Sequence, residues 1–260
     1  MPRHSAHRPD SSLVPDTNHT PLLESPLLPH EHRYSGKYDG FLERLTEVPL
    51  DILFEIFSHL HPLDLLRLAR TTKTLRSILM QRSATSVWKA TISNVDGLPP
   101  CPPDLDEPEY VNLAFDDHCH FCFVSGVNDI FWSCRVRCCK SCVDEHFVSE
   151  YDLKKKIPLA SAYKKSRAIF PFIVYPKPRP YKPGRILFYL PIAERYVTEL
   201  AQLQGTCSQG TLRDWSRKKT EEQDRRLSHA ALCESWSSHW VHKRSSEVNL
   251  LIIVFLVAAC

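Results

Sequence analysis

The stretch LTEVPLDILFEIFSHLHPLDLLRLARTTKTLRSIL, residues 45–79, carries apolar residues at helical spacing. Pro49 suits the first helical position, because its missing N–H would be unpaired there, and Asp51 lies in the first turn, where the helix dipole favours an anion. The pattern predicts an amphipathic helix that begins near Pro49. Its apolar stripe consists of Ile52, Leu53, Ile56, Phe57 and Leu60.

Further short helices follow the first. His61-Pro62 ends the first helix, because the residue before a proline is pushed out of the helical region of backbone space. Pro62 can itself open a second helix, a third follows it, and the apolar period continues to Ile92. None of these helices can bury its apolar face alone, so the segment must pack internally or meet a partner.

The composition of the 260 residues, 43% hydrophobic and 24% charged, is that of a globular protein. Glycine is scarce, with seven residues, and proline is abundant, with twenty. Because glycine supplies the positive φ angles that phosphate loops and tight hairpins need, its scarcity argues against nucleotide-binding α/β folds and β-sandwiches. A net charge of +3 argues against a dedicated nucleic-acid binder. We therefore expect a mainly α fold.

Shifts in composition divide the chain into regions. Residues 1–40 hold prolines and histidines without an apolar period, a composition that cannot repay the entropy of ordering. Residues 93–117 combine prolines with carboxylates, and their first half breaks both helix and strand. The predicted regions are a disordered tail at 1–40, a three-helix unit at 41–92, an acidic proline-rich linker at 93–117, a cysteine module at 118–147, a basic stretch with C-terminal helices at 148–248, and an apolar tail at 249–260.

The basic stretch has an uneven charge balance. Between Tyr151 and Arg185 there are ten Lys or Arg residues and one acidic residue, Asp152. Between Cys101 and His118 the balance reverses, with six carboxylates and no Lys or Arg. One interpretation is a solvated loop that faces this acidic segment of the same chain, and the other is attraction of an acidic partner such as nucleic acid.

Two helices are predicted after the basic stretch, from Pro191 to Gly205 and from Leu212 to Trp236. The last eleven residues, Leu250–Cys260, are all apolar. As a helix they would reach about 17 Å, whereas the hydrocarbon core of a bilayer is about 30 Å thick. A buried strand, a truncated membrane anchor and a gene-model error are the alternatives for this run, and we expect no stable membrane anchoring.

Six of the ten cysteines lie between residues 119 and 142. A disulfide framework normally spreads its cysteines across a domain, and the N-terminus lacks the apolar run of a secretory signal, so we expect reduced thiols in an intracellular compartment. Two Cys-x-x-Cys pairs, separated by sixteen residues, have the spacing of a closed four-thiolate site, which is typical of structural zinc. The predicted ligands of this Zn²⁺ are Cys119, Cys122, Cys139 and Cys142.

Other side chains compete for the same role. The cysteines could instead pack as small hydrophobic side chains in their reduced form. A thiolate could also be replaced by Cys134, Cys138, His118, His120 or His146. Basic residues near the cysteines are expected to offset the −2 charge that four thiolates and one zinc ion leave, and these residues are Arg135, Arg137 and Lys140.

No motif nominates an active site. Residues 205–212 have the outer spacing of a phosphate loop, but Thr211 stands where the phosphate-binding lysine must be. A Gly-x-Ser-x-Gly elbow, a His-Glu-x-x-His motif and a glycine-rich dinucleotide turn are all absent from the sequence. We therefore expect a protein that is not an enzyme and takes no small-molecule substrate.

The helical stretch resembles an F-box. The proline at Pro49, the Ile-Phe pair, the Leu-x-Pro-x-Asp-Leu-Leu turn, the Lys-x-x-Arg pattern and the closing Trp88 all match, while Val48 stands where leucine is commoner. The whole chain is similar to fungal F-box proteins in which a Cys-x-x-Cys…Arg-x-Arg-x-Cys-x-x-Cys segment follows, here residues 119–142. No leucine-rich, WD or kelch repeat is visible downstream, so the sequence leaves the substrate undefined.

This resemblance implies recruitment. F-box motifs dock on the Skp adaptor of SCF-type ubiquitin ligases, and a cullin links that adaptor to the ubiquitin-charged enzyme. The chain would then hold a protein substrate in the cytoplasm or nucleus and perform no bond chemistry. The alternative is a zinc-stabilised protein that binds nucleic acid through residues 154–185. The adaptor-facing or motif-defining positions of the family correspond to Leu45, Pro49, Ile52, Leu53, Ile56, Leu60, Pro62, Leu65, Leu66 and Trp88.

Overall fold

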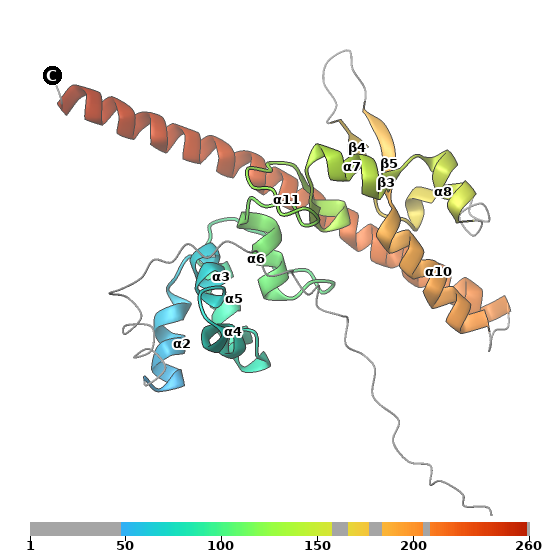
Figure 1. Cartoon of the computed structure of the whole chain (residues 1–260), viewed down its shortest axis with the longest axis horizontal. Coiled ribbons are helices and arrows are strands. Elements are labelled where there is room, and N and C mark those ends of the chain that lie inside the picture. The colour runs from blue at the N-terminus through green and yellow to red at the C-terminus, as the bar shows by residue number, and fades with distance from the viewer. Residues whose placement is uncertain (1–47, 158–165, 177–183, 205–208, 259–260) are drawn as a thin grey trace, which may run out of the picture. The chain divides into compact units, whose positions relative to one another are not determined.

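The computed structural model describes residues 48–157, 166–176, 184–204 and 209–258 (Figure 1), and all of them belong to one compact unit, Arg44–Cys260. Most of the elements in these ranges are helices, as the expected mainly α fold requires. The expected disordered tail at 1–40 and two parts of the basic stretch lie outside the described residues.

The N-terminal helices are α2 (Leu50–Ser58), α3 (Pro62–Ala69), α4 (Lys73–Leu79) and α5 (Thr85–Ser93), with the 3-10 turn η1 (Arg82–Ala84) before α5. Their starts follow from the sequence. The ring of His61 accepts a hydrogen bond from the N–H of Leu63 at 3.3 Å, directly before Pro62 opens α3. The hydroxyl of Thr72 caps α4 by accepting from the N–H of Leu75 at 3.1 Å.

The apolar faces of these helices form one core. The helices α2 and α3 both contact α5, and α3 also contacts α4. The ring N–H of Trp88 donates to the carbonyl oxygen of Leu79 at 2.8 Å, so this large buried side chain leaves no polar atom unpaired. The side chains buried in this core include Leu53, Phe57, Leu65, Leu66, Leu75, Leu79, Val87 and Trp88.

The segment that the sequence suggests is a linker, residues 93–117, contains the helix α6 (Glu107–Phe115). Asp106 and Glu109 form a reciprocal capping box at its start, so the carboxylates of this segment begin a helix rather than prevent one. Tyr110 and Val111 are fully buried, and α6 contacts both α3 and α5. The second half of the expected linker is therefore an additional helix of the N-terminal core.

Short strands follow α6. The strands β1 (Ile130–Phe131) and β2 (Val136–Arg137) pair antiparallel on either side of the 3-10 turn η2 (Trp132–Cys134). After α7 (Lys140–His146), a second antiparallel sheet has the order β3-β5-β4, with β3 at Phe147–Val148, β4 at Phe172–Tyr175 and β5 at Arg185–Tyr189. The helix α8 (Glu150–Lys156) lies between β3 and β4 in the chain. The sequence analysis predicts none of these strands.

Two C-terminal helices confirm the predicted ones and extend the second. The helix α10 spans Leu190–Gln204, and α11 spans Gln209–Ala258. The backbone of residues 249–258 continues α11, so a strand is the wrong interpretation of the apolar run. Within the part of the chain that the structure describes, no helix has the length and apolar composition that crossing a bilayer requires.

Lys219 joins the two C-terminal helices. Its ammonium lies 2.7 Å from a carboxylate oxygen of Glu199 on α10 and 3.2 Å from one of Glu222 on α11. The same group lies 4.4 Å from the centre of the Tyr196 ring, which adds a cation–π contact. These contacts therefore balance the positive charge of the buried lysine.

Asp104 ties the proline-rich segment to two distant elements. One carboxylate oxygen accepts from Nη2 of Arg135 and the other from Nε of Arg135, both at 3.2 Å, while Nε of Arg226 on α11 lies 3.2 Å from the carboxylate. Burial raises the pKa of Asp104, but the hydrogen bonds from Arg135 and the charges of both arginines outweigh this effect and hold the pKa below its usual range. Asp104 therefore stays ionised.

We predict that Asp104→Ala lowers the free energy of unfolding by about 3 kcal/mol, because it leaves two nearly buried arginines without their shared counter-charge. Asp64→Ala is the matched control, since it breaks the ion pair with Arg67 whose side chains are both more than half exposed. Asp64→Ala should lower the free energy of unfolding by less than about 1 kcal/mol. Urea unfolding followed by circular dichroism measures both, and equal losses would contradict the prediction.

Candidate functional site

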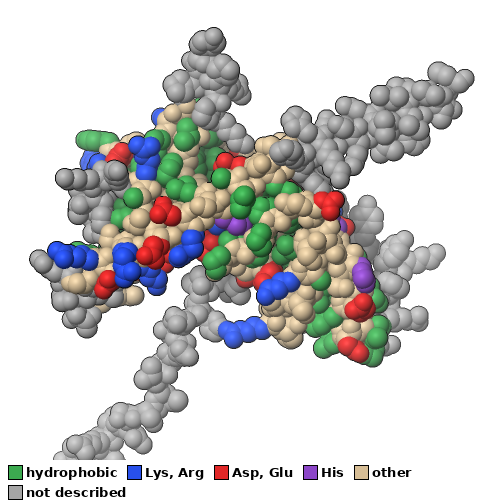
Figure 2. Space-filling view, turned by 180° about the vertical axis from the view of Figure 1, so that it is seen from behind, with side chains coloured by type: hydrophobic (Ala, Val, Ile, Leu, Met, Phe, Trp, Pro, Cys, Tyr) green, Lys and Arg blue, Asp and Glu red, His purple; other side chains and the backbone are tan. Residues whose placement is uncertain are grey.

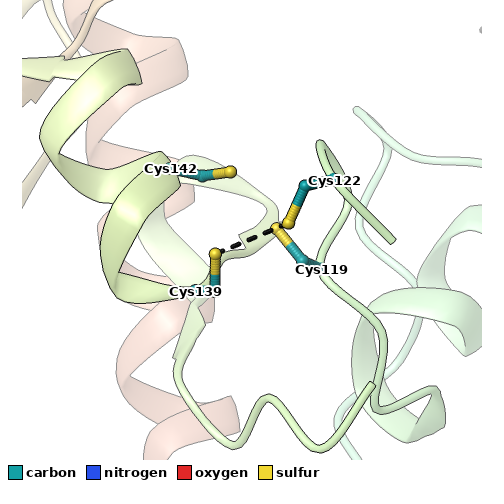
Figure 3. Close-up of side chains that lie close together, drawn as sticks. All are labelled: Cys119, Cys122, Cys139 and Cys142. Carbon is teal, nitrogen blue, oxygen red and sulfur yellow. Dashed lines mark hydrogen bonds between the residues drawn. The ribbon is translucent and has the colours of Figure 1, made fainter. Parts of the chain in front are cut away.

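Four cysteine sulfurs converge on one point (Figure 3). The Sγ atoms of Cys119, Cys122, Cys139 and Cys142 all lie within 4.8 Å of one another. Cys119 and Cys122 come from the loop before β1, while Cys139 is the residue directly before α7 and Cys142 lies in the first turn of this helix. The structure thus brings together the two Cys-x-x-Cys pairs that the sequence analysis selects.

The spacing of the sulfurs fits a metal rather than a disulfide. The Sγ atoms of Cys122 and Cys139 are 3.6 Å apart. A disulfide would bring them to about 2 Å. In a tetrahedral zinc site with bonds of ~2.3 Å, two ligand sulfurs are separated by ~3.8 Å. The donor set of four thiolates also matches a closed structural site, which has no open position for a substrate.

The backbone around Cys119 favours its thiolate form. Burial raises the pKa of this cysteine, but the backbone N–H groups of Cys122, Cys139 and Phe121 point toward its sulfur and lower the pKa to about 6. Burial, together with the neighbouring cysteines, raises the pKa of Cys142. A divalent cation would relieve this crowding of four thiols, because it favours the deprotonated form of all its ligands.

The loop that carries Cys119 and Cys122 is a tight turn. The N–H of Phe123 donates to the carbonyl oxygen of Cys119 at 3.0 Å, and the N–H of Cys119 donates to that of Val124 at 2.9 Å. The turn requires a left-handed backbone at Phe123, where φ is 58°. A residue with a side chain adopts this conformation at a cost of about 1–2 kcal/mol, which glycine avoids. The backbone conformation of the turn therefore favours glycine at position 123, but the chain has a phenylalanine there.

The competing ligands have partners outside the four-sulfur cluster, although Cys138 also makes a side-chain hydrogen bond with Cys119. Cys138 donates to the carbonyl oxygen of Cys139 at 3.3 Å, and the buried Cys134 contacts the hydroxyl of Ser133. Among the histidines, His118 contacts Asp116 at 2.6 Å, His120 contacts Asn112 at 3.3 Å, and His146 stacks on Phe121 with ring centres 3.8 Å apart. His146 also lies with Glu145 within 4.8 Å of the Cys142 sulfur. The four-sulfur cluster nevertheless contains only the four predicted cysteines.

Two of the three basic residues expected to offset the charge of the thiolates, Arg135 and Arg137, also have structural partners. Arg137 is buried, and its guanidinium donates to the carbonyl oxygens of Val127, Leu113 and Ala114 at 2.7, 3.0 and 3.3 Å. Arg135 binds Asp104 and the carbonyl oxygen of Trp132. The Arg-x-Arg motif thus joins the cysteine loop to α6 and to the proline-rich segment.

A second candidate site lies on α2. Leu50, Ile52 and Ile56 are 52, 50 and 51% exposed, although all three are large and apolar. They share a nine-residue helix with Leu53 and Phe57, which point into the core. Ile52 and Ile56 lie four residues apart on one face of the helix, and we call these two side chains the α2 ridge, while Leu50 lies about 160° away around the helix axis. The sequence analysis missed Leu50, whose signal is its place directly after Pro49 in the first turn.

Residues 45–83 match the family model of the F-box domain. The chain carries an F-box domain. No curated protein matches the chain, and no solved structure does. The F-box domain reaches from the segment before α2 into η1, so Trp88 lies beyond it, in α5.

The structure divides the predicted adaptor-facing residues of the F-box into two groups. Ile52, Ile56 and Pro49 are exposed, and Leu60 is half-buried. Leu45 lies outside the described residues. The remaining positions are buried, and their side chains pack inside the domain: these are Leu53, Pro62, Leu65, Leu66 and Trp88.

We predict that the purified chain binds one Zn²⁺ and that Cys139→Ser loses it together with the structure of residues 118–147. A site of this kind is rarely formed in the unfolded chain, so the free energy of metal binding becomes free energy of folding. Cys134→Ser is the matched control, because Cys134 is buried nearby but lies outside the cluster. Metal analysis and thermal unfolding with and without a chelator measure these effects.

Two outcomes would overturn this assignment. A zinc stoichiometry near zero in protein purified without added metal would reject the site. Full zinc content in Cys139→Ser with loss in Cys138→Ser would keep the metal and change the ligand.

Proposed function

We propose that this chain is a non-catalytic, substrate-recruiting subunit of an SCF-type ubiquitin ligase. Its F-box domain would dock on a Skp-type adaptor, which a cullin links to the ubiquitin-charged enzyme. The rest of the chain would hold a protein substrate. The α2 ridge on the F-box domain is the observation that carries this proposal.

The ridge has the character of a protein-binding surface. Large apolar side chains gathered on one exposed helix gain free energy only when another surface covers them. Burying the exposed half of each side chain contributes about 1 kcal/mol, and a helical partner can reach Ile52 and Ile56 at once because they lie one turn apart on the same face. The buried residues behind them, Leu53 and Phe57, fix the position of α2 before the partner arrives.

Zinc has a structural role in this proposal. The four cysteines would hold one Zn²⁺ and fasten the loop of Cys119 and Cys122 to the start of α7. The adaptor, the cullin and the substrate all meet the chain inside the cell, in the cytoplasm or nucleus, where the reducing environment keeps these thiols free. The chain supplies no group for bond chemistry and takes no small-molecule substrate.

The described charges favour a protein partner over nucleic acid. Lys154 of the basic stretch pairs with Glu150 of the same helix at 2.9 Å. On the face seen in Figure 2, Lys and Arg side chains alternate with Asp and Glu rather than forming a basic stripe. The described side chains of this face therefore do not form the electrostatic footprint that phosphate backbones require, while five of the ten basic residues between 151 and 185 lie outside the described residues.

We predict that Ile52→Asp with Ile56→Asp abolishes binding to a purified Skp-type adaptor, with a loss of at least 100-fold in affinity. An adaptor that covers these positions would bury two unpaired carboxylates, at a cost of several kcal/mol. The matched control is Leu232→Asp, which places the same charge on another exposed apolar residue, 59% exposed on α11. Isothermal titration calorimetry measures the affinities.

Circular dichroism must show that the double variant keeps its helices. Leu66→Asp is unsuitable for this test, because Leu66 is buried and the substitution would unfold the domain. Adaptor binding that survives in the folded double variant would reject the proposed function.

A further inference from the structure

The tight turn after Cys122 exposes two adjacent apolar side chains. Phe123 is 39% exposed and Val124 is 49% exposed. Neither belongs to the core cluster that contains Cys119 and Val127, although both lie between these two residues in the chain. Among the described residues, no aromatic ring stacks on Phe123. We call Phe123 and Val124 the turn tip.

The fold does not account for the ring of Phe123. The left-handed backbone at this position, with φ at 58°, favours glycine, and the chain uses glycine at the next left-handed position of the same loop, Gly126. The hydrogen bonds that close the turn are backbone bonds, so they would form without the ring. A large side chain that opposes its own backbone conformation, lies outside the neighbouring core cluster and stays 39% exposed is explained best by an external partner.

Two exposed carboxylates lie near the loop of the turn tip, each with a histidine beside it: His118 is 3.1 Å from Asp117, and His146 is 3.9 Å from Glu145. Asp117 accepts from the N–H of Gly126 at 3.3 Å, which places its carboxylate, 59% exposed, in the same loop. Glu145 is 72% exposed, and its carboxylate lies within 4.8 Å of the Cys142 sulfur, which is itself within 4.8 Å of Cys122. With zinc bound, the four thiolates add a charge of −2. The complementary partner is apolar at its centre and positively charged around it.

We propose that the turn tip is a docking point for a polypeptide segment in which one large apolar side chain is flanked by Lys or Arg residues. Phe123 and Val124 would contact the apolar side chain, and Asp117 and Glu145 would attract the flanking charges. This inference rests on the proposed function in one respect, namely that the bound segment belongs to the substrate that the F-box subunit recruits.

Phe123→Gly is the sharpest variant for a test, because it removes the ring and relieves the backbone. The full-length, zinc-loaded chain is used to select peptides from a random heptapeptide phage library, and the most enriched peptide is then synthesised for fluorescence polarisation. We expect enrichment of Lys- and Arg-rich peptides with one large apolar residue. Phe123→Gly should weaken the selected peptide at least tenfold while keeping its zinc and a thermal midpoint at or above that of the original chain. Leu232→Ala, the matched control, should bind the peptide unchanged.

The charges have a separate test. Glu145→Lys should weaken the same peptide severalfold and reduce the dependence of its affinity on salt concentration. Enrichment of neutral or acidic peptides, no enrichment, or equal binding by Phe123→Gly would overturn the proposal. Adaptor binding measured on the same preparation separates the two hypotheses. If the chain binds the adaptor but gives any of these results, only the proposed docking point is rejected. If the chain binds the peptide but not the adaptor, only the proposed ligase role is rejected.

Discussion

Two arginines share one carboxylate at Asp104, and the arrangement of the chain beyond the F-box depends on this contact. Arg135 comes from the loop between β1 and β2, and Arg226 from the middle of α11. Where such groups are nearly buried, a missing counter-charge is far more costly than at the surface, so the three elements must stay together. Two further hydrogen bonds join α11 to the same proline-rich segment. His229 contacts the carbonyl oxygen of Pro100 at 2.9 Å, and the ring N–H of Trp236 donates to the carbonyl oxygen of Asp96 at 3.1 Å.

The helix α2 shows how one short element serves both stability and binding. Its inward side chains, Leu53 and Phe57, meet the core, while Ile52 and Ile56 on another face are equally apolar and are about half exposed. A helix that needed only to be stable would carry polar residues on this side. The function proposed for the F-box domain thus follows from apolar surface that the fold itself leaves uncovered.

Local patterns predicted the helices of residues 50–93, the two C-terminal helices and the four cysteines, because all of these depend on spacing along the chain, whereas α7 and α8 were not predicted. The start of α3 follows from Pro62, and the sulfur cluster follows from two Cys-x-x-Cys pairs. The helix α6 was missed because its prolines outweighed the capping pair of Asp106 and Glu109. The strands are two to five residues long, too short for a period, and their pairing joins distant segments. The inward position of Leu66 and the outward position of Leu50 depend on which helices pack together.

The exposed apolar side chains of α2 also govern how the chain behaves before it meets a partner. An uncovered cluster of this kind attracts any other apolar surface, including the same cluster on a second molecule, so it promotes aggregation. A partner that covers the cluster competes with self-association by mass action, and its binding adds to the apparent stability of the chain. The ratio of partner to chain in the cell, rather than the helical core alone, would then determine how much of this protein stays dispersed.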